Sequence, residues 1–157
     1  MLDKSILNIR DYIEADHAAV WMLHNEALAA TGAHAGDGPW DDDLHKITEQ
    51  YVNQGGIFLV GLLEEKLVAM GALKRVDSTT GEIKRMRVAP AYQRRGYGTA
   101  ILVAVEQRAR ELGIVRLTLD TTDIQVAAQS LYQKHGYREA GRGSAAGFSI
   151  IYYEKTR

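Results

Sequence analysis

Apolar residues in two parts of the chain recur at the spacing of a helix. In Gly98–Leu112 they lie three, four and three positions apart, which predicts a helix whose apolar face carries Leu102, Val105, Ala109 and Leu112. Gly113 follows this segment and is a good C-terminal stop. A second helix is predicted over Glu14–Ala30, with an apolar face made of Val20, Leu23, Ala27 and Leu28.

Short apolar runs predict the strands. Ile57–Leu63 and Leu67–Leu73 flank a polar turn and predict a hairpin of two buried strands. Ile114–Asp120 is rich in β-branched residues and leucine, which favours a third strand. The other predicted strands are Ile6–Arg10, Glu82–Val88, Tyr137–Ala140 and Phe148–Glu154, the last two around a glycine-rich loop.

Turn and capping residues predict the rest of the chain. Thr31–Asp43 is predicted as a loop because it holds three glycines, Pro39 and an acidic run. A short helix is predicted over Leu44–Val52. Thr122-Asp123-Ile124-Gln125 fits a capping box at the start of a helix that runs to about His135. The resulting order of elements predicts a mixed α/β sheet in one domain over residues 1–157.

Composition excludes several classes of protein. The chain has 157 residues, 46% of them hydrophobic, so a disordered tail protein is excluded. It has no cysteine, which excludes disulfides, a cysteine nucleophile and a cysteine-ligated zinc. A formal net charge of −1 argues against nucleic acid as the main partner. With no apolar stretch of about 20 residues and no signal-like N-terminus, we expect a cytoplasmic protein without a membrane partner.

Candidate chemistry gathers where the strand Glu82–Val88 passes into the helix that starts near Gly98. A helix N-terminus leaves about four N–H groups unpaired, and glycines let a phosphate approach them closely. Five cations and no acid lie within residues 84–98: Lys84, Arg85, Arg87, Arg94 and Arg95. The segment predicts a pyrophosphate site that is neither a P-loop nor a Rossmann fingerprint. The alternative interpretation is a glycine turn with solvated arginines.

Two motifs extend this picture. Gln93, Gly96 and Gly98 match the pattern Arg/Gln-x-x-Gly-x-Gly/Ala, and Arg87-Val88-Ala89-Pro90 precedes it. Further along, Ala128–Tyr137 matches Ala-x-x-Leu-Tyr-x-x-x-Gly-Phe/Tyr. Over Ile57–Tyr137 the chain therefore resembles the GCN5-related N-acetyltransferases (GNAT superfamily). The resemblance implies a single-domain GNAT fold, with a mixed sheet of about six to seven strands flanked by helices and splayed between the fourth and fifth strands.

The resemblance also implies how acetyl-CoA, as co-substrate, is held. After Gln93, backbone N–H groups are expected to bind its pyrophosphate; these belong to Arg94, Arg95, Gly96, Tyr97, Gly98 and Thr99. The backbone of Met86, Arg87 and Val88 is expected to pair with the pantetheine arm. Gln125 stands where many members have an asparagine that contacts the cofactor, although its place in the capping box explains it equally well.

Two residues match catalytic positions of the family. Tyr132 holds the position of the general acid that protonates the leaving thiolate, and it could also be a core tyrosine. Glu82 holds the position of a glutamate that removes the proton of the attacking amine. The alternative for Glu82 is a solvated glutamate beside Lys84 or Lys74.

The acceptor region has weaker signals. An acidic rim that attracts a cationic substrate could be made by Asp37, Asp41, Asp42, Asp43 and Glu49, but helix capping and solvation are slightly favoured. Trp40 and Tyr92 could line an acceptor pocket, whereas Trp21 is expected in the core. No histidines have metal-ligand spacing, so no metal is expected.

The favoured hypothesis is an N-acetyltransferase in which a primary amine of a small molecule or peptide attacks the thioester directly. A homodimer is expected from the resemblance alone. The alternatives are a non-catalytic acyl-CoA-binding or sensing domain and a nucleotide-binding regulatory module.

Overall fold

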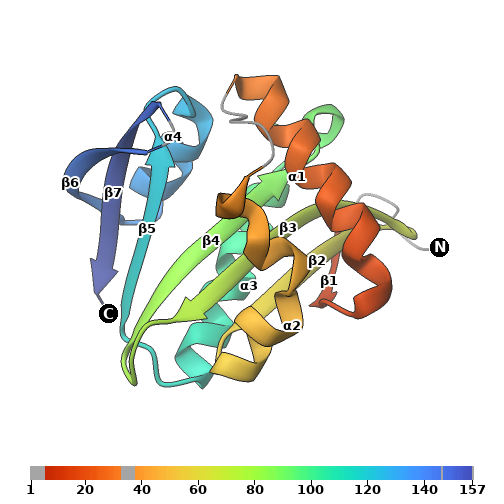
Figure 1. The fold of residues 1–157 in the computed structure, drawn as a ribbon, viewed down its shortest axis with the longest axis horizontal. Coiled ribbons are helices and arrows are strands. Elements are labelled where there is room, and N and C mark those ends of the chain that lie inside the picture. The colour runs from red at the N-terminus through yellow and green to blue at the C-terminus, as the bar shows by residue number, and fades with distance from the viewer. Residues whose placement is uncertain (1–5, 33–37, 146, 157) are drawn as a thin grey trace.

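The computed structural model describes residues 6–32, 38–145 and 147–156 (Figure 1). Its strands form one sheet in the order β1-β2-β3-β4-β5-β7-β6, in which the pair β4/β5 is parallel and the other neighbours are antiparallel. The strands are β1 (Asn8–Asp11), β2 (Ile57–Leu63), β3 (Lys66–Arg75), β4 (Thr80–Val88), β5 (Arg116–Thr122), β6 (Arg138–Ala145) and β7 (Phe148–Thr156). The predicted mixed α/β sheet is confirmed.

Helices cover both faces of this sheet. The α-helices are α1 (His17–Thr31), α2 (Ile47–Gln50), α3 (Tyr97–Glu111) and α4 (Val126–Lys134), and the 3₁₀ helices are η1 (Glu14–Asp16), η2 (Pro39–His45), η3 (Val52–Gln54) and η4 (Pro90–Tyr92). In Figure 1, α1 and α2 lie in front of the sheet and α3 behind it. One core packs α3 against the sheet and includes Leu102 and Val105, and the other packs α1, η2 and α2 and includes Val20 and Leu44.

Most of the two predicted apolar faces is buried. Leu102, Val105 and Ala109 have no exposed surface, Val20, Leu23 and Ala27 are buried, and Leu28 and Leu112 are partly buried. Two loop predictions are wrong. From Pro39 onward the predicted loop Thr31–Asp43 becomes η2, with Pro39 in its first turn, while residues 33–37 lie outside the described residues. β6 continues through most of the predicted glycine-rich loop, because β7 supplies backbone partners along its length.

The strands β4 and β5 part after three paired residues, which confirms the expected splay. Thr80–Glu82 pairs with Arg116–Thr118, and no pairing with β5 is seen for Ile83–Val88 among the described residues. A bulge in β4 lies beside the point of separation, because Met70 pairs with Arg87 but Ala72 pairs with Lys84. Arg85, within the bulge, has a φ of 59°. A bulge bends its strand and increases the local twist, which favours the separation.

Candidate active site

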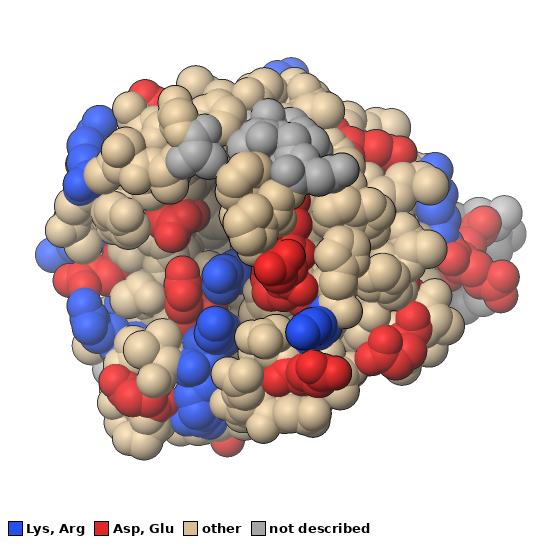
Figure 2. Space-filling view, viewed as in Figure 1, with Lys and Arg blue, Asp and Glu red and all other residues tan. Residues whose placement is uncertain are grey.

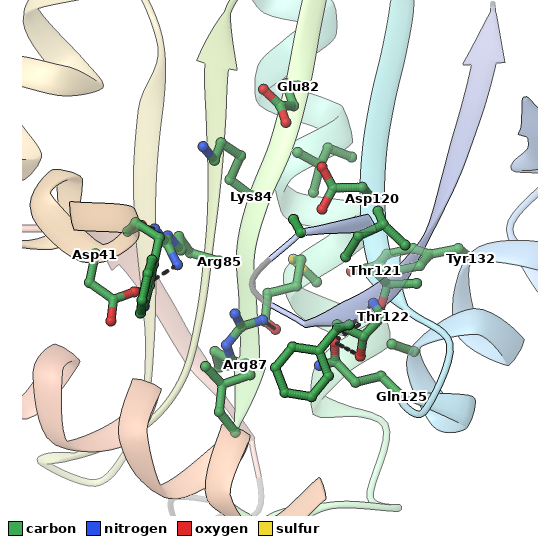
Figure 3. Close-up of a pocket in the computed structure, with 18 residues that line it drawn as sticks. Asp41, Glu82, Lys84, Arg85, Arg87, Asp120, Thr121, Thr122, Gln125 and Tyr132 are labelled. Carbon is green, nitrogen blue, oxygen red and sulfur yellow. Dashed lines mark hydrogen bonds and ion pairs between the residues drawn. The ribbon is translucent and has the colours of Figure 1, made fainter. Parts of the chain in front are cut away.

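A cleft of about 280 Å³ opens where β4 and β5 separate (Figure 3). Its walls come from both strands, from α4 and from the front helical layer. β4 contributes residues 82–87, and the opposite wall contributes Asp120, Thr121, Thr122, Gln125, Ala128 and Tyr132. Leu28, Trp40, Asp41, Ala145, Phe148 and Ile150 complete the lining. The cleft therefore brings together Glu82, Met86, Arg87, Gln125 and Tyr132 from the predicted site.

Glu82 lies where the two strands begin to part. It is the last β4 residue that pairs with β5, opposite Thr118, and it is partly buried. Burial raises the pKa of its carboxyl above 4.5; the ammonium of Lys84 opposes the shift and the carboxylate of Asp120 adds to it. A carboxylate with a raised pKa is a stronger base, so Glu82 is suited to accept a proton in the cleft.

Tyr132 satisfies both interpretations of its position. Its ring is 5% exposed and packs against the rings of Tyr137 and Tyr153, at centroid distances of 5.8 and 6.4 Å. The side chain also lines the cleft, and no hydrogen bond joins its hydroxyl to another described residue. Burial raises the pKa of Tyr132 to about 12, against the opposing effect of the Arg87 guanidinium. The hydroxyl therefore keeps its proton at neutral pH and can donate it.

The N-terminus of α3 follows β4 after η4 and a short turn, residues 89–96. Gly96 caps the helix with a φ of 85°, and an added Cβ there would meet no atom within 4 Å. The Gln93 side chain donates a hydrogen bond of 3.1 Å to the Val88 carbonyl and so ties this turn to the end of β4. N–H groups of a first helical turn have no acceptor within the helix and favour anions. Val88 and residues 93–99 thus lie beyond the cleft lining, in a position suited to a phosphate.

Gln125 has a different local role from the predicted one. The helix α4 starts at Val126, so Gln125 is the residue before the helix rather than its third residue. Its Oε1 still accepts hydrogen bonds from the N–H and O–H of Thr122, at 3.3 and 2.8 Å. The capping-box prediction is therefore wrong in position, because Thr122 is still part of β5. A cofactor contact by Gln125 stays a prediction.

Arg85 does not belong to a phosphate site. Its guanidinium binds Asp43 through Nε at 3.0 Å and Nη2 at 2.5 Å, and it reaches Asp41 through Nη1 at 3.4 Å. Nη2 also donates to the carbonyl oxygen of Trp40 at 2.6 Å. The predicted group of five cations is thus divided: Arg94 and Arg95 lie at the helix N-terminus, and Lys84 and Arg87 line the cleft.

The ion pairs of Arg85 also show that Asp41 and Asp43 fit neither prediction made for them, an open acidic rim or solvated helix caps. Burial alone would raise the pKa of Asp43, but the hydrogen bonds and charge of Arg85 outweigh it and hold that pKa below its usual 3.8. Asp41 is buried and lies 3.0 Å from His24 Nε2. These two carboxylates therefore neither cap a helix nor form an open rim. Asp42 and Glu49 are exposed, and Asp37 lies outside the described residues.

Of Trp21, Trp40 and Tyr92, the aromatic residues predicted for an acceptor pocket or the core, only Trp40 lines the cleft. Trp40 is 48% exposed and lines the cleft. Trp21 is partly buried against the rings of His24 and His45. Tyr92 contacts the cations of Lys66 and Arg95 and does not line the cleft.

Sequence reasoning missed Asp120 and Phe148 in the cleft wall. Asp120 had a usable signal, because it ends a predicted strand next to the expected splay and polar residues at the ends of strands often face ligands.

The described residues hold no group of three or more His, Cys, Asp or Glu side chains arranged to bind a metal ion, and His34 lies outside them. Within the same residues, no helix has the length and apolar character needed to span a bilayer.

Comparisons with known proteins give the family. The model of the acetyltransferase (GNAT) family matches residues 15–137. Human N-acetyltransferase 8 is 35% identical over 106 residues, which are 64% of this chain and 47% of that protein. The uncharacterized N-acetyltransferase YedL of Escherichia coli is 42% identical over 77 residues, 48% of each chain. The chain thus spans about half the length of these curated relatives.

Solved structures agree on the fold. A GNAT-family acetyltransferase of Staphylococcus aureus superposes with a TM-score of 0.88 over 96% of this chain and 99% of its own, at 23% identity. The yncA protein of Salmonella typhimurium, solved with its cofactor acetyl-CoA, superposes with a TM-score of 0.79 over 96% and 94% of the two chains, at 21% identity. The family match, the splayed sheet and both sequence motifs lead to one conclusion: this chain belongs to the acetyltransferase (GNAT) family.

Proposed function

We propose that this chain transfers the acetyl group of acetyl-CoA to a primary amine by direct attack on the thioester. The observation that carries the proposal is the cleft at the splay, which has Glu82 on one wall and Tyr132 on the other. The first turn of α3 is close to this region, because a Cβ added at Gly98 would lie 3.5 Å from Leu131 on α4 and 3.8 Å from Val88 at the end of β4. The family match and the curated relatives named as N-acetyltransferases support the same activity.

The residues present fit acetyl-CoA as the donor. The N–H groups of the first turn of α3 would bind its pyrophosphate, with Gly96, where an added Cβ would meet no atom within 4 Å, leaving room for close approach. The backbone of Met86–Val88, which β5 leaves without a partner, would pair with the pantetheine arm as an added strand. Bound in this way, acetyl-CoA supplies a thioester carbon that is open to nucleophilic attack.

Glu82 and Tyr132 have complementary roles in the proposed reaction. The amine nitrogen forms a bond to the acetyl carbon and the carbon–sulfur bond breaks. The proton of the amine passes to the Glu82 carboxylate, directly or through a water. The Tyr132 hydroxyl gives its proton to the leaving sulfur, whose parent thiol has a pKa near ~8.5 by analogy with cysteine. No covalent enzyme intermediate is needed.

The test is CoA release from acetyl-CoA, read with a thiol reagent, across a panel of amines. Because the chain has no cysteine, the reagent reads CoA alone. Amine-dependent release above the hydrolysis seen without amine is expected. Tight binding of acetyl-CoA with no release for any amine would contradict transfer and favour a sensing domain.

A further inference from the structure

Arg87 is a cation in the cleft without a matching anion. It is partly buried on β4, and its buried Nε has no hydrogen-bond partner in the part of the chain that the structure describes. Its Nη1 donates to the neighbouring Met86 carbonyl at 2.8 Å, and no described carboxylate lies within ion-pair distance. An arginine that has lost water and gained no anion is in an unfavourable state that a bound anion would relieve.

Arg85, two residues away, differs from Arg87 because its guanidinium has carboxylate and carbonyl acceptors for its hydrogen bonds. Asp41, Asp43 and the Trp40 carbonyl accept its hydrogen bonds, and Figure 3 shows its side chain turned toward Asp41. These acids are therefore already engaged with a cation. The Arg87 charge thus faces the cleft without an equivalent partner, and the nearby Arg85 charge makes this position less favourable for it.

The position of Arg87 is next to the proposed chemistry. Arg87 and Tyr132 both line the cleft, and the guanidinium acts electrostatically on the Tyr132 hydroxyl. In Figure 3, Arg87 lies toward one end of the cleft, and Glu82 and Asp120 lie toward the other. Figure 2 shows the same mixture on the surface, where a band of Lys and Arg side chains is bordered on both sides by Asp and Glu.

We propose that the acceptor is an α-amino acid and that the Arg87 guanidinium binds its carboxylate. This inference rests on the proposed function and names the substrate class of the same site. A guanidinium binds a carboxylate through two parallel hydrogen bonds. Because Nε is buried, the two terminal nitrogens would supply them, with Nη1 using the N–H that it does not give to the Met86 carbonyl. In an α-amino acid the amine and the carboxylate share one carbon. An anchor beside Tyr132 therefore places the amine close to the thioester, on the side of Glu82 and Asp120.

Other amine acceptors do not use this anchor. A polyamine, a peptide N-terminus and a protein lysine carry no carboxylate beside the reacting amine. A cleft of about 280 Å³ also suits a small acceptor.

The experiment measures kcat/KM for CoA release with each proteinogenic amino acid and with its α-amide, which has the same side chain and amine but no carboxylate. The wild-type enzyme is compared with Arg87→Met, Arg87→Lys and the control Arg110→Met, which alters an exposed arginine on α3. Calorimetric titration of acetyl-CoA without acceptor is run on each protein. Comparing the acid-to-amide ratio of each variant with that of the wild type cancels the intrinsic reactivities of the two amines.

The wild-type enzyme is expected to prefer at least one amino acid over its amide. Loss of a charged hydrogen-bonding partner predicts that this ratio falls roughly 10- to 100-fold in Arg87→Met. The ratio of Arg87→Lys should lie between those of the wild type and Arg87→Met, because lysine keeps the positive charge but cannot make two parallel hydrogen bonds to a carboxylate. Acetyl-CoA affinity should stay within about twofold in all variants, and Arg110→Met should match the wild type.

Three results would overturn the inference while leaving acetyltransfer intact. They are equal use of acids and amides by the wild-type enzyme, an unchanged ratio in Arg87→Met, and acetylation of other amines with no amino acid used. Weaker acetyl-CoA binding in Arg87→Met with an unchanged ratio would assign Arg87 to the donor instead. Failure of the wild-type enzyme to bind acetyl-CoA would overturn the proposed function itself, and this inference with it.

Discussion

The two ends of β4 differ in whether they pair with β5. At the first end, Thr80–Glu82 pairs with β5 and its backbone groups are used within the sheet. At the second end, residues 83–87 line a cleft, because β5 has separated from β4. The bulge at Arg85 lies near the point where the strands part. One strand is therefore paired with β5 at one end, and at the other end no pairing with β5 is seen among the described residues.

The comparison also applies to the side chains. Arg85 lies in the unpaired end of β4 but turns its side chain to η2, and it binds η2 to β4 through largely buried ion pairs with Asp41 and Asp43. On the cleft side, which is the open side of the strand, Glu82, Arg87 and Tyr132 line the cavity. Arg85 is thus engaged in ion pairs that join two elements, whereas Glu82 and Arg87, from the same short stretch of β4, line the cleft in which we propose the reaction takes place. The following predictions test this difference.

The largest effect is expected from Arg85→Met, which leaves the buried carboxylates of Asp41 and Asp43 without their cation. Removing one member of a buried ion pair costs about 3–5 kcal/mol of the free energy of unfolding. Urea denaturation at neutral pH measures this loss. The matched control is Arg116→Met, which breaks an exposed pair with Glu154 and should cost about 1 kcal/mol or less. A similar small loss in both variants would show that the buried pairs do not hold η2 to β4.

The pH dependence of the same variant follows from the lowered pKa of Asp43. A lowered pKa in the folded state stabilises the protein at pH values above the ordinary 3.8, and this stability is lost as the pH falls through the folded-state pKa. In Arg85→Met the cation that lowers the Asp43 pKa is gone, and burial of the carboxylate should raise that pKa. Protonation of Asp43 should therefore stabilise the variant. The difference in stability between the two proteins should therefore begin to narrow above pH 3.8, as Asp43 of the variant is protonated, and narrow further below 3.8, as the wild type loses its ion pair. A difference that widens on acidification would contradict this.

On the open side, Tyr132→Phe tests the proposed general acid. Losing a positioned proton donor is expected to lower kcat by about 100-fold or more, while acetyl-CoA affinity and stability change little. Steady-state kinetics and calorimetry separate the two. Because the pKa of Tyr132 is about 12, the wild-type enzyme should show no loss of this donor up to about pH 10. An unchanged kcat would remove Tyr132 from the reaction.

Glu82→Gln tests the proposed base. The wild-type kcat/KM should rise with pH as the Glu82 carboxyl ionises, with a midpoint above 4.5 because burial raises its pKa. The variant should lose this acid limb and be roughly 10- to 100-fold slower on the plateau. The exposed Glu65→Gln serves as the control. An acid limb that persists unaltered in Glu82→Gln would assign the base elsewhere.

The smallest effect is expected from Gly98→Ala, in the first turn of α3. The new Cβ would meet Leu131 at 3.5 Å and Val88 at 3.8 Å, which are ordinary contacts, so the protein should fold normally. The methyl group would narrow the approach of a phosphate, and acetyl-CoA binding should weaken by roughly tenfold. Gly113→Ala, at a φ of 76°, should instead lower stability and leave binding intact. The opposite pattern would place the phosphate elsewhere.

Features that depend on neighbouring residues were predictable from the sequence. The helix α3 shows its apolar face at regular spacing, and the glycine motif before it is contiguous. The cleft residues Glu82 and Tyr132 were identified only because their motifs resemble a known family. Their burial and the neighbours that shift the pKa of each were not predictable.

Long-range pairing set the limit of these predictions. Arg85 and Asp43 are 42 residues apart, so nothing local distinguished Arg85 from the other cations of its segment. The acidic run looked like caps or a rim because its partner lies on another element. The extension of β6 depends on β7, which supplies its hydrogen bonds. The lack of an ion-pair partner for Arg87 becomes visible only from the positions of the carboxylates in residues 6–32, 38–145 and 147–156.

The most direct test of the account is calorimetric titration of the wild-type chain with acetyl-CoA, CoA and ATP in parallel. ATP has phosphates for the N-terminus of α3 but no pantetheine arm for the open end of β4. We predict micromolar binding of acetyl-CoA and CoA and binding of ATP that is weaker by about 100-fold or more. Equal binding of all three would show that the open strand has no part in recognition, and no binding of either CoA species would contradict the site as a whole.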